Sequence, residues 1–462
     1  MKDLIDNPAV AGPAGSEQPA KPARRGFLGR AGGLALAAGS LAAGSVAAAQ
    51  TAQAAPQPAA APSSNPKDGI EPFFGVHQGG IITPQQDYTY LAVFELQTDQ
   101  RADVIALLKR WTEASAKMTR GDVAGPLGNS DGVVGDNPDA PPNPNDIAPG
   151  DSGEALGLAP SRLTFTFGFG PSLFECNGVD RYGLAAQRPA ALVDLPKFNG
   201  DQLVAEKTGG DLYIQACAND AQVAFHAVRQ LARLAYGRAA IKWVQTGFQA
   251  SPKDGSTGRN LMGFRDGTNN PSPGDPALMS QFVWAGDEGP AWMKNGTYTV
   301  VRRIRITLEH WDQMQLSFQE QVVGRRKYSG APLGKEKEFD PVDLTAQDKD
   351  GNPVIPANSH VGLSNPGSND GKRILRRGYS YNDGANFYIE RWPPWRQEVE
   401  YDAGLLFIAH QRDPRTGFIP INQRLAKIDI MNQFITHVGS GIFATPPGAR
   451  EGSYIGAALF ET

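Results

Sequence analysis

The order of hydrophobic patterns along the first half of the chain constrains the fold most. Residues 88–96 alternate and are rich in aromatic side chains, which predicts a strand. Residues 101–118 carry apolar side chains at helical spacing, which predicts a helix. The same patterns predict strands over 163–169, 212–217 and 240–248, and a helix over 221–236. The resulting order, β-α-β-β-α-β, is that of a split βαβ unit with an antiparallel sheet.

The second half of the chain repeats this order. The patterns predict a strand over 298–308, a helix over 309–327, strands over 386–390 and 405–411, a helix over 423–435 and a short extended segment over 441–445. We therefore expect an α+β fold of two ferredoxin-like (split βαβ) domains with antiparallel sheets. Their expected bounds are residues 73–255 and 256–462.

The N-terminal segment has the pattern of an export signal. Two arginines precede Phe27-Leu28, and a weakly apolar run from Ala31 to Ala49 ends near the small-residue pattern Ala52-Gln53-Ala54. This order predicts a secretory signal over 1–54, and the paired arginines indicate the twin-arginine route. A transmembrane anchor is the alternative, but the run contains too many Ala and Gly residues to make a good one. We expect export to the periplasm, cell envelope or outside, with no stable membrane span after cleavage.

Composition excludes several classes of protein. The segment 55–72 is rich in Pro and Ala and is expected to be a flexible leader. The whole chain has 462 residues, which is enough for two or three hydrophobic cores. A net charge of −4 argues against a nucleic-acid-binding surface. With only two cysteines, Cys176 and Cys217, a disulfide-dense scaffold, a Cys-rich zinc site and an iron–sulfur cluster are excluded. The two cysteines are compatible with one disulfide or with two buried thiols.

A loop in the second half places a carboxylate between two glycines. The stretch from Gly263 to Pro271 reads Gly-Phe-Arg-Asp-Gly-Thr-Asn-Asn-Pro. Gly263 and Gly267 allow a positive φ and a close approach to another surface, so the backbone can aim Asp266 at a partner. An ordinary surface turn is the alternative, because Asp-Gly and Asn-Pro are common turn dipeptides.

The six histidines offer few obvious metal ligands. None forms an i, i+4 pair of the kind found on zinc-binding helices, and no Cys-x-x-Cys-His motif for covalent haem is present. His226 lies in an amphipathic helix and is expected either to pack or to lie on the surface there. His77 and His437 lie in expected loops flanked by glycines and are harder to dismiss as functional residues. His360 lies in a long expected loop, within Ser-His-Val-Gly-Leu-Ser-Asn-Pro, just before Leu375-Arg376-Arg377-Gly378-Tyr379.

Three of these elements together resemble a known family. Gly263-x-x-Asp266-Gly267, the segment around His360 and the Leu-Arg-Arg-Gly-Tyr segment resemble the dye-decolourising haem peroxidases, over roughly Phe73 to the C-terminus. With the twin-arginine leader, the resemblance is greatest to their exported branch, which includes deferrochelatase/peroxidases linked to iron uptake. It implies one non-covalent haem b per chain, held mainly by the C-terminal domain.

The resemblance also implies roles for individual residues. His360 would be the metal ligand, and Asp429, in the last expected helix, would support its second ring nitrogen. Asp266, Arg376 and Asn270 would lie on the opposite face of the haem, although the adjacent Arg377 leaves a one-residue ambiguity. The remaining expected contacts with the cofactor are made by Gly263, Gly267, Leu405 and Phe407.

The implied reaction is the reduction of hydrogen peroxide, coupled to single-electron oxidation of bulky dyes or phenols. Asp266 would move a proton between the peroxide oxygens, and Arg376 would stabilise charge on the departing oxygen. Electrons would arrive through surface aromatic residues, for which the candidates are Trp292, Trp311, Trp392, Trp395 and Tyr379. The alternatives are a deferrochelatase, which releases iron from haem with the porphyrin intact and works with iron-uptake components, and a non-enzymatic exported haem-binding protein. The latter would not need Asp266 and Arg376.

Overall fold

The computed structural model describes residues 69–128, 149–250, 252, 254–389 and 397–461. The expected signal, including its paired arginines, lies outside these residues, as do Trp392 and Trp395. Within the described ranges, no helix is both long enough and apolar enough to cross a bilayer.

The fold mixes helices with antiparallel strands, as expected. The strands are β1 (Tyr88–Leu96), β2 (Thr164–Phe169), β3 (Leu212–Ala218), β4 (Ala239–Phe248), β5 (Thr297–Ile306), β6 (Leu375–Arg376), β7 (Tyr379–Ile389), β8 (Gln397–Gln411) and β9 (Ile435–Thr445). The helices are α1 (Arg101–Met118), α2 (Pro171–Phe174), α3 (Ala221–Ala235), α4 (Pro276–Phe282), α5 (Leu308–Asp312), α6 (Leu316–Val323), α7 (His360–Ser364), α8 (Phe418–Ile428) and α9 (Ala457–Phe460).

The strands form a closed ring. Their order is β5-β9-β2-β3-β1-β4-β7-β8, and β8 pairs again with β5, while the two-residue β6 pairs with β8. All named strand pairs are antiparallel. Strands β1 to β4 meet strands β5, β7, β8 and β9 at two seams. Strands β2 and β9 are joined by one residue pair, Phe169 with Ala444, and strands β4 and β7 by another, Phe248 with Ser380.

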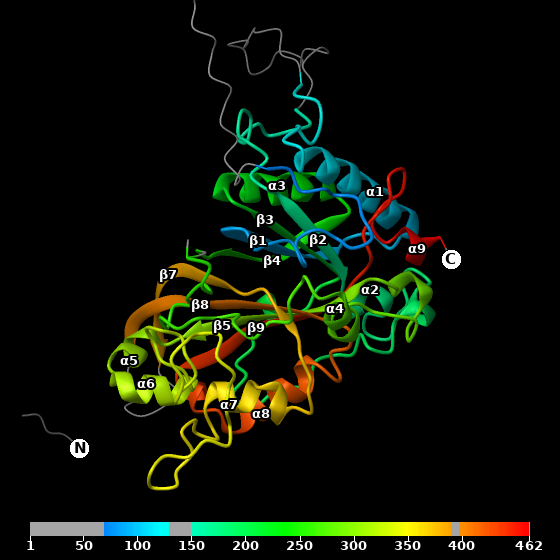
Figure 1. Cartoon of the computed structure of the whole chain (residues 1–462). Coiled ribbons are helices and arrows are strands. Elements are labelled where there is room, and N and C mark those ends of the chain that lie inside the picture. Colours follow the sequence, from blue (N-terminus) through cyan, green and yellow to red (C-terminus); the bar gives the residue numbers. More distant parts are fainter. Residues whose placement is uncertain (1–68, 129–148, 251, 253, 390–396, 462) are drawn as a thin grey trace, which may run out of the picture. The chain divides into compact units, whose positions relative to one another are not determined.

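Helices cover the outside of the ring, and an apolar cluster lies inside it together with buried polar side chains such as Arg303, which lies over the ring of Tyr381. Figure 1 shows α1 and α3 lying on one side of β1–β4, and α5 to α8 lying beyond the strands of the second half. Trp111 of α1 packs near Phe94 and Phe167, and its indole N–H donates to the carbonyl of Leu231 in α3. The apolar cluster is made by residues of both halves: Leu91, Val93, Tyr213, Trp243, Val301, Tyr381, Leu406, Ile408 and Phe443.

Two helices of the second half differ from expectation. The helix predicted over 309–327 is broken into α5 and α6, because Gln319 donates to the carbonyls of Trp311 and Met314 at the end of α5. Helix α6 then ends at Gly324, which has a φ of 88°, a conformation that favours glycine.

The helix predicted over 423–435 is also misplaced. The observed helix, α8, begins at Phe418, whose backbone N–H donates to the side chain of Gln411, and it ends at Ile428. Asp429 therefore lies after the helix and not within it. Its carboxylate accepts from the N–H of Met431 and caps a short 3-10 turn, after which β9 starts at Ile435.

Both cysteines are free thiols: Cys217 is buried and Cys176 is half-buried. The disulfide alternative is therefore excluded.

Candidate functional site

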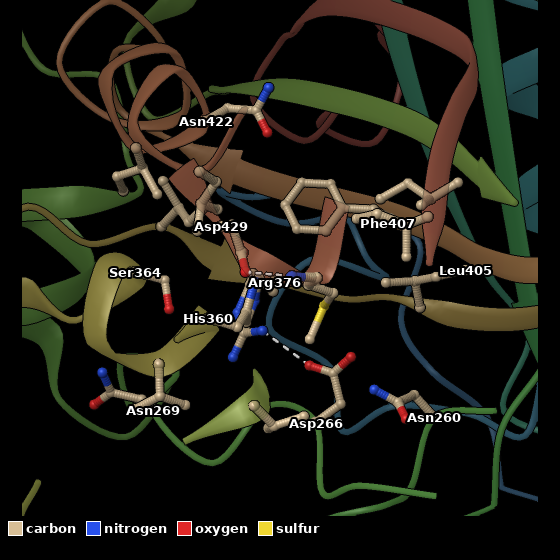
Figure 2. Close-up of a pocket in the computed structure, with 18 of the residues that line it drawn as sticks. Asn260, Asp266, Asn269, His360, Ser364, Arg376, Leu405, Phe407, Asn422 and Asp429 are labelled. Atoms are coloured by element: carbon tan, nitrogen blue, oxygen red, sulfur yellow. Dashed lines mark hydrogen bonds and ion pairs between the residues drawn. The ribbon is translucent and has the colours of Figure 1, made fainter. Parts of the chain in front are cut away.

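A cavity in the second half collects most of the predicted site residues. Asp266, Gly267, His360, Arg376, Leu405, Phe407 and Asp429 all line it. Figure 2 shows Leu405 and Phe407 along one strand, with His360, Arg376 and Asp266 grouped beside them. Gly263 and Asn270 do not line the cavity, so the expectation that Gly263 contacts the cofactor is not supported by its position.

His360 is held by a buried carboxylate. It is the first residue of α7, not part of an irregular loop, because the Ser359 hydroxyl accepts from the N–H of Gly362 and caps the helix. His360 Nδ1 lies 2.7 Å from Asp429 Oδ2. A carboxylate only accepts, so in the neutral imidazole Nδ1 carries the proton and Nε2 keeps a free lone pair. Burial is the largest single influence and lowers the pKa of His360, but the charge of Asp429, its hydrogen bond and the charge of Asp266 together raise the pKa, and the net shift is upward.

Arg376 is held by two residues of the glycine-flanked loop. Its Nη1 donates to Asp266 Oδ1 at 2.8 Å, a contact that Figure 2 marks with a dashed line. Asn270 bonds the backbone of Arg376 on both sides: its Nδ2 donates to the carbonyl (2.7 Å), and its Oδ1 accepts from the N–H (3.1 Å). Gly267 has a φ of 107°, which turns the loop between Asp266 and Asn270.

The adjacent arginine faces the other way. Arg377 is 4% exposed, and its guanidinium donates to the carbonyl of Thr83 (2.6 Å) and to the side chain of Gln86. Arg376 ends β6, and Arg377 continues its pairing with β8 by donating its N–H to the carbonyl of Ile408. Adjacent side chains of such a paired segment point to opposite faces, so only one of the two arginines can reach the cavity. That residue is Arg376.

Sequence reasoning missed several polar residues of the cavity wall. Asn260, Asn422 and Arg373 line it, and no motif marked them. Asn422 Nδ2 is buried and has no hydrogen-bond partner among the described residues. His437, which could not be assigned from sequence, also lines the cavity and lies in β9.

The other histidines lie elsewhere. His77 stacks on Trp284 with ring centroids 3.7 Å apart, and its Nδ1 lies 2.8 Å from the carbonyl of Asn295. His226 is buried in α3 near Asp151 and Glu154, so of the two positions expected for it, packed or on the surface, the structure shows the packed one. His310 and His410 do not line the cavity.

Three of the expected surface aromatics are buried. Trp292, Trp311 and Tyr379 are at most 3% exposed, so the prediction of surface positions for them is wrong. The reason is packing: the indole N–H of Trp292 donates to the carbonyl of Gln187, and that of Trp311 donates to the carbonyl of Met262. Exposed tyrosines exist at other positions, including Tyr328 and Tyr401.

The chain matches two family models in succession. Residues 78–249 match the N-terminal part of the Dyp-type peroxidases, and residues 257–450 match the C-terminal part. This chain belongs to the Dyp-type peroxidase family. The two matches together extend over both halves of the chain, as the resemblance over roughly Phe73 to the C-terminus implied.

Curated and solved relatives agree with this family. A dye-decolorizing peroxidase from Thermobifida fusca is 36% identical, over 95% of this chain and 97% of that protein. A deferrochelatase from Escherichia coli K12 is 35% identical, with the same coverage of both chains. Among solved structures, a DyP-type peroxidase from Streptomyces coelicolor has a TM-score of 0.75 and 39% identity, over 87% of this chain and 100% of that one.

Proposed function

We propose that this Dyp-type peroxidase binds one haem b non-covalently and reduces hydrogen peroxide, while dyes or phenols are oxidised by single-electron steps. One observation carries the proposal. A single cavity is lined by an imidazole supported by a carboxylate and by a guanidinium paired with another carboxylate: His360 with Asp429, and Arg376 with Asp266. The first pair suits an iron ligand and the second suits peroxide chemistry.

The residues of the cavity fit haem. His360 Nε2 has the free lone pair that iron needs, and Leu405 and Phe407 supply an apolar wall for the macrocycle. Asn422 Nδ2 is a buried donor without a protein partner, as expected where a ligand accepts the bond. When bound, haem would supply the redox centre that receives two oxidising equivalents from peroxide and passes them one at a time to the dye or phenol.

The other roles follow from charge and position. Asp266 takes the proton from one peroxide oxygen and delivers it to the other. Arg376, permanently charged, stabilises the negative charge that develops as the oxygen–oxygen bond breaks. Asn270 does not line the cavity, so its part is to hold the backbone of Arg376 with its two hydrogen bonds. Gly267 shapes the loop that presents Asp266.

The proposal extends to the architecture and location. We infer two ferredoxin-like domains, residues 73–255 and 256–462, because the first four strands and β5, β7, β8 and β9 have the same order: second, third, first, fourth. The C-terminal domain would hold most of the haem. We further infer that residues 1–54 are a twin-arginine signal followed by a leader over 55–72, so that the protein works in the periplasm, cell envelope or outside.

A second function deserves a direct assay because several relatives are deferrochelatases. Such an activity, serving iron-uptake components, would release iron from haem and leave the porphyrin intact. It would use the same cavity. A passive haem-binding protein is less favoured, because it would need His360 but not the Asp266–Arg376 pair.

The test is reconstitution with haem, followed by peroxide cleavage and dye oxidation. The wild type should show a Soret band and turnover, and His360→Ala should lose most of its haem or change its ferric spectrum. Arg376→Leu should cleave peroxide on the order of 10²–10³ times more slowly. The matched control is Arg412→Leu, which removes an exposed arginine–carboxylate pair with Glu288 and should leave the rate unchanged.

Four outcomes would contradict the proposal or part of it. Absence of a Soret band after reconstitution would show that the protein does not bind haem. Wild-type cleavage in Arg376→Leu would remove that residue from the chemistry, and a large loss in Arg377→Leu alone would move the role to its neighbour. Free iron together with intact protoporphyrin, in place of dye oxidation, would favour the deferrochelatase.

A further inference from the structure

A second histidine faces the cavity, and its protonated nitrogen can be identified. Arg302 Nε lies 3.1 Å from His437 Nδ1. A guanidinium only donates, so Nδ1 of His437 must accept, and the ring proton lies on Nε2. His437 lines the cavity, and no protein atom among the described residues accepts a bond from Nε2.

His360 and His437 therefore have opposite tautomers. Asp429 accepts at Nδ1 of His360, which leaves Nε2 as a lone pair for a metal. Arg302 donates at Nδ1 of His437, which leaves Nε2 as an N–H donor. The two rings line one cavity, and only His360 can ligate iron without losing its existing hydrogen bond.

A buried network fixes the His437 ring. Arg302 is fully buried, donates to Ser440 Oγ at 3.0 Å, and forms an ion pair with Asp201, whose side chain is 2% exposed. Its guanidinium also lies over the ring of Phe198, 5.4 Å from the centroid. Rotating the His437 ring would leave a buried N–H of Arg302 without a partner, which is costly. The donor is thus held in one orientation.

His437 also stays neutral. Burial, together with the positive charge of Arg302, lowers its pKa to about 3. The charged groups in contact with this network are Arg302 and Asp201, and neither changes the tautomer while Arg302 keeps its proton. His437 therefore presents the same single N–H at any pH above about 3.

We propose that His437 donates a hydrogen bond from Nε2 to a carboxylate of the bound cofactor, and that Arg302 is the positioning residue for this donor. The inference rests on the proposed haem function. The carboxylates are the anionic groups of the haem periphery, and a carboxylate that enters a protein needs donors. A neutral N–H next to a buried guanidinium is such a donor.

The experiment compares haem affinity in two variants of His437, by titrating haem into the full-length haem-free protein. His437→Phe keeps a ring and loses the donor, and its dissociation constant should rise about 10- to 100-fold, the usual effect of a hydrogen bond to a charged group. His437→Gln keeps an N–H and should restore much of the affinity. The matched control is His310→Phe, which replaces a histidine outside the cavity. This variant should bind haem with the affinity of the wild type.

A second measurement tests the tautomer without haem. Nitrogen-15 NMR of the histidine-labelled, haem-free protein should show the proton of His437 on Nε2, and Arg302→Lys should disturb that signal. A proton on Nδ1, or wild-type haem affinity in folded His437→Phe, would overturn the proposal. If the wild type binds no haem, the proposed function fails instead, while the tautomer is still determined by NMR.

Discussion

At the scale of single residues, motif and geometry answer different questions. The motifs predicted that His360, Asp266 and Arg376 belong to one site, and all three line one cavity. Asp429 was correctly paired with His360 across 69 residues of sequence, at 2.7 Å. The choice between Arg376 and Arg377 needed the backbone, because only the strand determines which side chain faces the cavity.

The residues that sequence reasoning missed, or gave no role, share a property. His437, Asn422 and Arg373 come from three separate elements, and none lies in a recognisable motif. Their relation to the cavity depends on how β9, α8 and the segment before β6 pack together. A pattern along the chain does not contain that information.

A buried histidine outside the cavity predicts acid sensitivity. His410 is fully buried, its Nδ1 lies 3.1 Å from Thr299 Oγ1, and burial together with Arg377 lowers its pKa to about 3. An unfolded histidine titrates near 6.5, so below that pH the unfolded chain binds a proton that the folded chain does not. Stability should therefore fall as pH drops from about 6.5 towards 3.

The measurement is the free energy of unfolding in urea, at pH 7 and pH 5, for the wild type and His410→Gln. The histidine should contribute a loss of about 2 kcal/mol on acidification, which the variant should lack. An equal pH dependence in both proteins would show that His410 takes up a proton without unfolding.

At the scale of elements, the sequence predicted the first half better than the second, where β7, β8 and β9 each begin several residues before their predicted starts. The bounds predicted for β1 and α1 agree with the structure, because strong periodicity extends over both. The helices of the second half were misplaced because side chains intervene: Gln319 satisfies the end of α5, and Asp429 caps the turn that follows α8. These polar contacts are individually small and do not change the apolar pattern.

The short α7 depends on its cap more than a long helix would. Five residues gain few internal hydrogen bonds, and the Ser359 hydroxyl supplies one at the N-terminus while donating to the carbonyl of Pro356. Ser359→Ala should lower the free energy of unfolding by about 1 kcal/mol and also weaken haem binding, because His360 starts this helix.

The control for this variant is Asp275→Ala, which removes the corresponding cap of α4, away from the cavity. Thermal unfolding should show similar losses for both variants, and haem titration should separate them. Equal haem affinity in Ser359→Ala and the wild type would mean that the cap does not position His360.

At the scale of the whole molecule, the closed ring was not predicted. The repeated element order predicted two related halves, and the strand orders are consistent with this. The ring, however, forms where one half meets the other, through Phe169 with Ala444 and Phe248 with Ser380. One residue pair per seam is too little to leave a pattern in the sequence.

The two seams should also make the protein open unevenly. Pairs β1–β3 and β5–β8 extend over many residues, whereas β2 with β9, and β4 with β7, are joined by one residue pair each. Amide hydrogen exchange should therefore be faster near Phe169 and Ser380 than in the middle of β1 or β5, although all these residues are largely buried. Mass spectrometry of peptic fragments would measure this difference. Uniform protection around the ring would mean that the two halves open only as one cooperative unit.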